Sequence, residues 1–451
     1  MAAVTLLQLP WREPIQVLAG FAHEPWTMAL LSGGGERWSY LVRRPDRTLE
    51  IRASDPADPF EALGGLIGEA ADAHADGPPF QGGVVGLCAY ELGARAEGLA
   101  LQRPDHWPDL ICARYPAALA FDHHSHSLLA VGRGADHGQA RVQARSAATW
   151  LDDRRDEFPQ ADRVLAEDVH CEPQELYEAA VRDVVQRIRQ GEIFQANIAR
   201  RWRGRLTPAA RPFDLLQRLG TASPAPFAAY VRLPGLAVVS NSPERFVSVR
   251  RDVDGLIAET QPIKGTAPRG RDADEDVRNA AALSASAKDR AENLMIVDLM
   301  RNDLARVCRP GTVETPRLFQ LRSFANVHHL VSTVTGRLAE GRGGVDLLRA
   351  SLPPGSITGA PKVQAMKVIA GHEAPRGPFF GSIFWAGPDG AMDSSVLIRT
   401  AAFTEHEDGG WTVETRAGAG IVADSDPTSE RRETEAKISS ILNALTNDPA
   451  A

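Results

Sequence analysis

The feature that most constrains the fold is the separation of strand-like and helix-like segments along the chain. Short runs rich in branched and aromatic residues, such as "FAAYVRL" (227–233) and "GWTVETRAGAGIV" (410–422), are divided by Gly, Pro and Asp clusters. Runs of this kind with turn residues between them predict antiparallel strands. The helical patterns stand in separate blocks and do not alternate with strands one by one. This order favours an α+β fold over a doubly wound nucleotide-binding sheet.

Three long segments have the periodicity of helices, and they lie at 172–200, 285–307 and 428–445. In the first, Gly191 ends a run of apolar residues near helical spacing: Leu176, Ala180, Val184 and Ile188. Before it, a charged, helix-prone stretch at 144–169 resembles a connector. We therefore expect a strand-rich N-terminal region over residues 1–160 and a second region over residues 170–447.

The segment "ARYPAALAFDHHSHSLLAVGRG" (113–134) predicts a β-hairpin with "DHHSH" at its tip. Its three histidines raise the alternative of a metal site. No set of carboxylates or cysteines accompanies them, so a solvated turn is the simpler interpretation.

Composition excludes several classes of protein. The net charge of −8 and the pI near 5.9 argue against a nucleic-acid partner, which requires a basic face. No stretch approaches about 18 consecutive apolar residues, so we expect no membrane span, and the N-terminus lacks the pattern of a secretion signal. The four cysteines are far apart and lack C-x-x-C spacing, which is typical of reduced, buried thiols in a cytoplasmic protein: Cys88, Cys112, Cys171 and Cys308.

A single lysine is unusual within the strand-like segment "LIAETQPIKGTAPRG" (256–270). Lys264 follows an apolar residue and precedes Gly265, which lets a ligand or another backbone approach closely, while Pro262 fixes the entry of the chain. A lysine desolvated in a pocket loses its proton more readily and becomes a nucleophilic amine. On spacing alone, a structural or surface role is the simpler interpretation.

Acidic residues form a second candidate site. Glu292 lies beside an apolar stripe of one helix, while Glu430, Glu433 and Lys437 share one side of the closing helix. Carboxylates beside a buried face require a partner, and Mg²⁺ is a usual one. The alternative is a set of solvated glutamates paired with arginines. Glu244 in "SNSPERF" follows a strand and a proline, which suits either a general acid or base or a surface turn residue.

Two glycine-containing segments suggest anion binding. "GSITGAPK" (355–362) does not meet the phosphate-loop pattern, because that pattern has glycine directly before lysine and here Pro361 also removes an amide donor. "RAGAGIV" (416–422) has glycines whose backbone amides could approach an anion, although a tight turn explains it nearly as well.

Taken together, these segments closely resemble the chorismate-utilising enzymes, which include the anthranilate, aminodeoxychorismate, isochorismate and salicylate synthases. The resemblance covers residues 170–445 in the family's order, and "FQGGVVGLCAYELGARAEGL" (80–99) extends it into the N-terminal region. The matching segments are "GEIFQANIAR", "SNSPERFVSV", "QPIKGTAPRG", "DRAENLMIVDLMRNDLARVCRPGTV", "HHLVSTVTGRL", "LPPGSITGAPKVQAM", "RGPFFGSIFWAGPDGAMDSSVLIRT" and "GAGIVADSDPTSERRETEAK".

The resemblance implies two large antiparallel sheets packed as a sandwich, with helices outside and the active site between them. It implies a Mg²⁺ ion carried by Glu292 and Glu433, with Glu430 close by. It also implies that His329 lies near the departing hydroxyl and that Glu244 handles the proton on the C4 oxygen. The positions that match contacts to the substrate carboxylates are Thr358, Arg399, Gly418, Ala419, Gly420 and Lys437.

Two positions distinguish the branches of the family. Isochorismate and salicylate synthases have a water-activating lysine where this chain has Gln195, and anthranilate synthases usually read "PIAGT" where it has "PIKGT". The lysine form is similar to the aminodeoxychorismate synthases. That similarity implies attack by Lys264 on C2 of chorismate, followed by addition of ammonia at C4.

The chain has no cysteine in a glycine-rich nucleophile elbow, so we expect a separate glutamine amidotransferase subunit as the source of ammonia. We also expect a separate lyase to form 4-aminobenzoate for folate. The alternatives are the anthranilate synthase reaction, the isochorismate synthase reaction and a non-catalytic ligand-binding relative.

Overall fold

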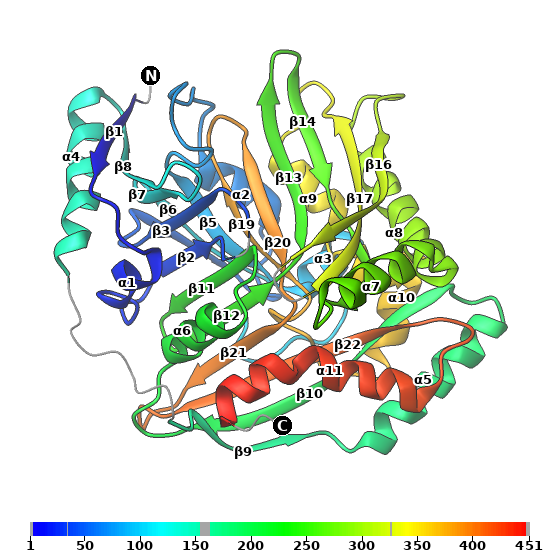
Figure 1. Cartoon of the computed structure of the whole chain (residues 1–451). Helices are drawn as coiled ribbons and strands as arrows, with labels where there is room; N and C mark the ends of the chain where they lie inside the picture. The colour runs from blue at the N-terminus through cyan, green and yellow to red at the C-terminus, as the bar shows by residue number, and fades with distance from the viewer. Residues whose placement is uncertain (1–2, 34, 154–162, 325–326, 448–451) are drawn as a thin grey trace.

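Two large antiparallel sheets with helices around them make up the computed structural model, which describes residues 3–33, 35–153, 163–324 and 327–447 (Figure 1). The largest apolar cluster contains Tyr40 and Val231 from one sheet and Leu87 and Phe246 from the other. The sheets therefore pack face to face over a shared core. This arrangement confirms the expected α+β fold.

The first sheet has twelve strands. In pairing order they are β1 (Ala3–Leu9), β8 (Ser127–Gly134), β7 (Ala117–Asp122), β3 (Trp38–Val42), β2 (Thr27–Leu31), β11 (Phe227–Leu233), β12 (Leu236–Ser242), β21 (Thr400–Glu405), β22 (Trp411–Ile421), β10 (Gln195–Leu206) and β18 (Gly359–Ala360), with β9 (Ala166–Cys171) also pairing with β10.

The second sheet has ten strands. In pairing order they are β15 (Ile263–Pro268), β17 (Val327–Arg337), β14 (Gly255–Thr260), β13 (Arg245–Asp252), β20 (Met392–Val396), β19 (Ser382–Ala386), β5 (Gly83–Cys88), β6 (Leu110–Tyr115) and β4 (Arg47–Ile51), with β16 (Glu314–Ser323) also pairing with β17.

The helices lie outside the two sheets (Figure 1). None of those in the described ranges is long and apolar enough to cross a membrane. They are α1 (Pro14–Ala19), α2 (Pro59–Ile67), α3 (Tyr90–Ala96), α4 (His137–Ala148), α5 (Gln174–Arg189), α6 (Pro212–Ala222), α7 (Ala273–Ala285), α8 (Ala287–Ala305), α9 (Gly344–Ser351), α10 (Lys362–Ala370) and α11 (Pro427–Thr446), with 3₁₀ turns at Thr149–Asp152 and Gly355–Ile357.

The N-terminal and C-terminal regions build both sheets together. Strands before residue 135 occupy one end of each sheet and strands after residue 194 occupy the other, and the two sets meet where β2 pairs with β11 and where β5 pairs with β19. Among the several places where the chain changes sheets, it passes from the first sheet to the second between β12 and β13, and from the second to the first between β20 and β21. These two crossings hold Glu244 and Arg399.

Most of the expected elements are present. The hairpin of β7 and β8 has its turn at the predicted histidines, where His123 bonds to Ser39 Oγ at 2.7 Å and His126 stacks on Trp11. Among the described residues, no group of His, Cys, Asp and Glu side chains forms a metal site, here or elsewhere. All four cysteines are free thiols: Cys88, Cys112 and Cys308 are buried and Cys171 is partly exposed.

The predicted connector at 144–169 is less uniform than expected. It begins in the last turns of α4 and ends in β9, while residues 154–162 lie outside the described residues. A part of the charged stretch is therefore strand and pairs with β10.

The predicted buried face of α5 is partly wrong. Leu176 is 66% exposed, and the buried side chains include Tyr177, Val181 and Val184. Residues spaced by four drift about 40° around a helix at each step, so a run of such spacings leaves the buried stripe. The helix ends at Arg189, two residues before Gly191 at φ 79°, close to the predicted end.

Lys362, the lysine of the segment that does not meet the phosphate-loop pattern, forms a buried ion pair. Its Nζ atom donates to Asp303 Oδ2 at 2.7 Å and to the Ser351 carbonyl at 2.6 Å, and both charged side chains are buried. Burial raises the pKa of Asp303 to about 6 despite the nearby ammonium group. The lysine is therefore held inside the protein and does not face a ligand.

Lys362→Met should destabilise the protein by about 3–5 kcal/mol, because it leaves the buried Asp303 carboxylate without its cation. Chemical unfolding of both proteins measures the difference. Arg271→Met breaks an ion pair with Glu275 whose arginine is 91% exposed, and it should cost less than about 1 kcal/mol. Equal losses in the two variants would contradict the assignment of a buried, structural ion pair.

Candidate active site

Lys264 is the second residue of β15, at the edge of the ten-stranded sheet. The pairing register of β15 with β17 shifts across Gly265, which has φ 89°, a left-handed conformation that favours glycine. A Cβ atom there would lie 3.0 Å from side-chain atoms of Asp289 and Leu283. The glycine thus lets α7 and α8 approach β15, and the irregularity sets the direction of Lys264.

The Lys264 amine reaches towards the twelve-stranded sheet. Its Nζ atom is 3.2 Å from the position that a Cβ atom would take at Gly420 in β22. Burial lowers the pKa of Lys264, and the neighbouring charge of Lys437 lowers it further. Three carboxylates act in the opposite direction: Glu292, Glu244 and Glu433. A lysine with a lowered pKa has a larger share of neutral, nucleophilic amine.

Glu244 is buried in the crossing between β12 and β13. Burial raises its pKa to about 7, although the Ser356 hydroxyl, the charge of Lys264 and the Ile263 backbone amide act in the opposite direction. The carboxyl group can therefore hold or release a proton near neutral pH, as a general acid or base requires.

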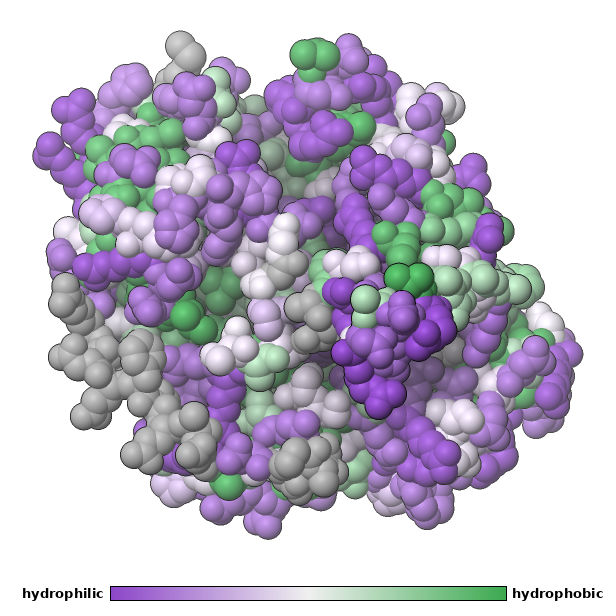
Figure 2. All heavy atoms as spheres, in the orientation of Figure 1, coloured by the Kyte–Doolittle hydropathy of each residue, from purple (hydrophilic) through white to green (hydrophobic). Residues whose placement is uncertain are grey.

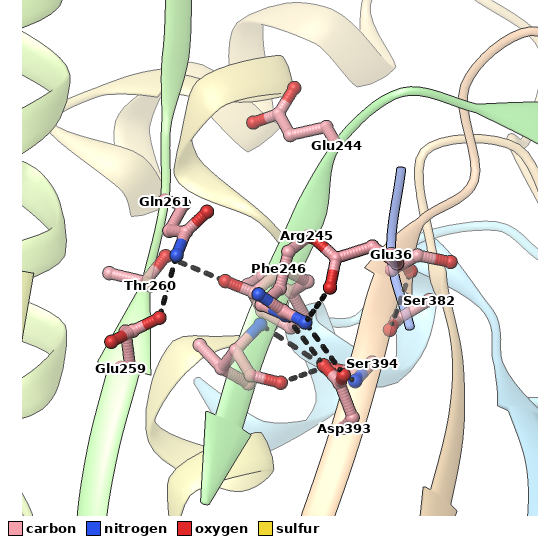
Figure 3. A network of polar contacts seen from close by, with 12 residues as sticks. Glu36, Glu244, Arg245, Phe246, Glu259, Thr260, Gln261, Ser382, Asp393 and Ser394 are labelled. Atoms are coloured by element: carbon pink, nitrogen blue, oxygen red, sulfur yellow. Dashed lines mark hydrogen bonds and ion pairs between the residues drawn. The ribbon is translucent and has the colours of Figure 1, made fainter. Parts of the chain in front are cut away.

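Glu244 and Arg245 point in different directions from adjacent positions (Figure 3). Arg245 is fixed by Asp393 at 3.0 Å and by Glu36 at 3.2 Å. It lines a cavity of about 240 Å³ between the sheets, together with Trp38 and other residues. This ion-paired anchor and the bond from Val396 N to the Glu244 carbonyl hold the crossing in place, so the Glu244 carboxyl group faces Lys264 from a fixed backbone.

His329 lies on β17, the strand that pairs with the Lys264 strand. Its Nδ1 atom bonds to Thr266 Oγ1 at 2.9 Å, and Phe324 contacts its ring edge to face. Burial, followed by the charge of Arg399, lowers the pKa of His329 to about 4. The imidazole is therefore neutral at neutral pH, and it can exchange hydrogen bonds there without adding a charge.

Arg399 stands at the second crossing, with φ 48°. Burial lowers its pKa. In the part of the chain that the structure describes, its guanidinium has neither an ion pair nor a hydrogen bond with a side chain. A half-buried cation without a partner is costly, and an anionic ligand would compensate it.

The three glutamates of the predicted metal site come from α8 and α11. Glu430 accepts a hydrogen bond from Ser425 at 2.6 Å, and Glu433 pairs with Lys437 at 2.6 Å. Burial raises the pKa of Glu430, and repulsion from Glu433 contributes. Lys288 lies 3.8 Å from Glu292 and also acts on both glutamates of α11, which places the three acids around one cation.

These acids could bind a divalent cation whose remaining ligands are oxygens of the substrate. No three acidic, histidine or cysteine side chains among the described residues lie close enough to bind a metal by themselves. Mg²⁺ usually takes one or two protein carboxylates and completes its shell with water and substrate oxygens. Glu292 and Glu433 could supply such a pair from opposite helices.

The glycines of β22 line the same site. Ala419 and Ile421 pack into the apolar cluster beneath α5 and α10, so the alternating positions Gly418 and Gly420 face the other way, towards Lys264. Lys437 donates to the Gly418 carbonyl at 3.0 Å. Of the three predicted contacts in this strand, Ala419 can therefore offer its backbone only.

Thr358 lies deeper than the other predicted contact residues. It is fully buried, and its hydroxyl donates to the Pro354 carbonyl at 2.8 Å. Its own carbonyl accepts from Asn197 N at 2.8 Å. These bonds join the 3₁₀ turn to β10, so Thr358 supports the wall of the site.

The site contains residues that the pattern of acids and lysines did not identify. Ser356 faces Glu244 from the segment that failed the phosphate-loop test. Asn197 lies on β10, two residues after Gln195, and both are buried amides. The period-two alternation of "QANI", with polar residues at the first and third positions of a buried strand, was the available signal.

Comparison with known proteins identifies the family. The chain matches the chorismate binding enzyme family over residues 27–443. Aminodeoxychorismate synthase component 1 of Escherichia coli K12 is 38% identical over 98% of both chains. Anthranilate synthase component 1 of Thermus thermophilus is 36% identical over 92% of this chain and 88% of that one. The structure of anthranilate synthase component I from Streptococcus pneumoniae matches with a TM-score of 0.77 and 26% identity, covering 90% of this chain and 92% of that one.

The chain therefore belongs to the chorismate-utilising enzymes and acts on chorismate. This confirms the family and the fold that the sequence motifs indicated.

Glu244→Gln should become more stable than the wild type as the pH rises from 4.5 to about 7, since the folded state holds the Glu244 proton more tightly than the unfolded chain. The wild type loses stability over this range and the variant does not. The difference should reach about 3 kcal/mol at most. Chemical unfolding between pH 4 and pH 8 measures it. Glu407→Gln, in an exposed turn, is the control, and a constant difference between wild type and Glu244→Gln would contradict the raised pKa.

Proposed function

We propose that this chain is the component that aminates chorismate at C4 to give 4-amino-4-deoxychorismate. The observation that carries the proposal is the position of Lys264, whose pKa is lowered and whose amine lies beside the Glu244 carboxyl group and the β22 glycines. The similarity to aminodeoxychorismate synthase component 1 over nearly the whole chain supports the same reaction.

In the first step, the neutral Lys264 amine attacks C2 of chorismate, the ring double bonds shift, and the C4–O bond breaks. Glu244 gives its proton to the departing oxygen, so the leaving group is water. A pKa of about 7 supports this role, because the carboxyl group is partly protonated at neutral pH. The product is a covalent adduct between Lys264 and the ring.

In the second step, ammonia adds at C4, the double bonds shift back, and the bond between C2 and Lys264 breaks. The Glu244 carboxylate accepts a proton from the incoming nitrogen. The lysine leaves as an amine, and both residues return to their starting states. One difficult displacement is thereby divided into two easier ones.

Cations around the amine suit a substrate with two carboxylates. Arg399 offers an uncompensated charge beside His329, while Lys437 and the backbone amides of β22 lie on the other side. These groups hold chorismate so that its ring faces Lys264. The neutral His329 imidazole lies where it can hydrogen-bond to a hydroxyl group without opposing the anion.

Glu292 and Glu433 would hold a Mg²⁺ ion, with Glu430 near them. The ion would neutralise and orient a carboxylate of the substrate. The chain's own residues supply the nucleophile and the proton transfers.

The ammonia comes from a glutamine amidotransferase partner. The Escherichia coli relative supports a partner, because its name describes it as component 1 of a synthase. We place the reaction in the cytoplasm, in agreement with four unpaired cysteines. Amination at C2 to give anthranilate is the second candidate, because the Thermus anthranilate synthase component is almost as similar. Lys264 favours C4, because a direct attack by ammonia at C2 leaves no role for this buried amine.

Incubation with chorismate and Mg²⁺ in the absence of ammonia should add to the protein the mass of chorismate less one water. Digestion and mass spectrometry should locate the adduct on Lys264. Lys264→Ala should lose the adduct and nearly all C4 amination, whereas Lys367→Ala, on the exposed side of α10, should keep both. A second incubation that also contains ammonium measures amination. Unchanged amination by Lys264→Ala, or prompt release of anthranilate by the wild type, in this second incubation would overturn the proposal.

Removal of one metal carboxylate should weaken the joint binding of Mg²⁺ and chorismate. In the wild type, the two ligands together should raise the melting temperature more than either alone, because each stabilises the bound state of the other. Glu292→Gln and Glu433→Gln should lose most of this joint effect, and Glu407→Gln should keep it. A joint effect unchanged in both variants would contradict the assignment of these ligands.

A further inference from the structure

One edge of β10 is only partly covered by other strands. β22 pairs with the inner edge, whereas the outer edge pairs with β18 at Gln195 and Ala196 and with β9 from Trp202 onwards. Between these two pairings, no strand in the described part of the chain lies against the outer edge. The backbone groups that point outward there still need partners, because a buried backbone group without one costs free energy.

Two side chains from the segment after α10 cover this edge. Glu373 accepts a hydrogen bond from Ala199 N at 2.8 Å, and Arg376 donates from Nη2 to the Asn197 carbonyl at 2.7 Å. The two side chains also bond to each other at 2.8 Å and 3.0 Å. Both are buried, with 6% of Glu373 and 2% of Arg376 exposed. This ion pair therefore takes the place of a neighbouring strand.

The guanidinium of Arg376 also holds the 3₁₀ turn at Gly355–Ile357. Its Nη1 atom donates to the Ile357 carbonyl at 3.1 Å, from the same planar group that holds β10. The rings of Tyr90 and Phe380 enclose this group, with their centroids 4.6 Å and 4.5 Å from its central carbon. A guanidinium has several donors in a rigid plane and can fix two backbone segments at once, whereas an ammonium group lacks this geometry.

The turn carries a hydroxyl group that faces the candidate proton donor. Ser356 directly precedes Ile357, and its hydroxyl bonds to the Glu244 carboxyl group. A hydroxyl that donates to a carboxylate stabilises the charged form, so its position influences how readily the acid gives up its proton. Two amines and one backbone amide also face this carboxyl group: Lys264, Lys437 and Ile263 N.

We propose that Arg376 is a positioning residue, which acts through the Ile357 carbonyl to hold the Ser356 hydroxyl against Glu244. The inference rests on the proposed amination reaction, in which Glu244 gives its proton to the departing oxygen. The hydrogen bonds of the guanidinium go to backbone carbonyls and to Glu373, so Arg376 influences the reaction through the turn. Displacement of the turn would remove a donor from the Glu244 carboxylate.

The test measures kcat for the consumption of chorismate between pH 6 and pH 9, with Mg²⁺ present and the concentration of free ammonia held constant. Arg376→Lys keeps a positive charge for Glu373 but loses the geometry that holds two carbonyls. Glu244 acts as an acid, so its deprotonation lowers the rate at high pH. Loss of the Ser356 hydrogen bond raises the pKa of Glu244. This basic limb should therefore move up by about one pH unit in both Arg376→Lys and Ser356→Ala.

Two further variants separate positioning from stability. The double variant Arg376→Lys/Ser356→Ala should shift the limb no more than Ser356→Ala does, because both changes remove the same hydrogen bond. Arg43→Lys is the matched control, since Arg43 is also 2% exposed, pairs with acids and stacks on the rings of Phe21 and Trp150. It follows β3, and five strands lie between β3 and β10 in the sheet. Arg43→Lys should lower the melting temperature and leave the basic limb in place.

The outcomes separate the possible roles. A lower melting temperature in Arg376→Lys with an unmoved basic limb would show a purely structural role and would overturn the proposal, as would additive shifts in the double variant. If Arg376→Lys does not fold, Arg376→Met/Glu373→Met removes both buried charges and takes its place in the comparison. Release of anthranilate by the wild type would overturn amination at C4. The position of the basic limb, measured on chorismate consumption, would still decide the role of Arg376.

Discussion

The structure depends on placing an amine and a carboxyl group together where neither is fully solvated. Lys264 comes from the edge strand of one sheet and Glu244 from the crossing between the sheets, and burial shifts the pKa of each towards neutrality. Each opposes the shift of the other, because an ammonium beside a carboxylate stabilises both charges. Burial has a larger effect on each of the two pKa values than this attraction has. The two shifts favour the neutral amine and the neutral acid, which are the forms that nucleophilic attack and proton donation require.

The architecture explains how such a pair is kept in place. The crossings that carry Glu244 and Arg399 are two of the points where the chain passes from one sheet to the other. Arg245, beside Glu244, is fixed by ion pairs in the core between the sheets (Figure 3). Rearranging the crossing would break these partly buried ion pairs as well as the site. Polar residues cover most of the face of the molecule seen in Figure 2, with apolar residues scattered among them.

Much of the fold could be predicted from periodicity, and much of the site could not. The hairpin at 117–134 and the closing helix follow from local patterns, because turn residues and apolar spacing act over a few neighbours. The sequence analysis wrongly placed Leu176 in the buried stripe of α5. The spacing of apolar residues predicts a helix, but tertiary packing decides which side of the helix is buried. Lys264 was ambiguous for a related reason: "PIKG" fixes the local backbone, whereas its pKa depends on burial and on Lys437 and Glu433, which are far away in sequence.

The family motifs identified site residues that lie far apart in the sequence. They did not indicate how each side chain is oriented or hydrogen-bonded. The motif does not indicate that Ala419 turns its side chain away from the site, or that Thr358 is engaged by Pro354. In the sequence, Gln195 and Asn197 cannot be distinguished from ordinary strand residues. The structure shows that both have buried amide atoms without a hydrogen-bond partner among the described residues. The sequence alone cannot show whether a buried polar atom has a partner, because its surroundings come from segments that are far apart in the chain.

The charges of the site give a physical reason for the proposed magnesium ion. The cations Lys264, Lys288, Arg399 and Lys437 face the acids Glu244, Glu292, Glu430 and Glu433, so the site is close to balanced by itself. Chorismate adds two carboxylates. Binding it without a compensating cation would raise the pKa of Lys264 again and remove the neutral amine. The proposed Mg²⁺ ion, held by Glu292 of α8 and Glu433 of α11, would restore the balance and would thereby preserve the lowered pKa that the proposed nucleophilic attack requires.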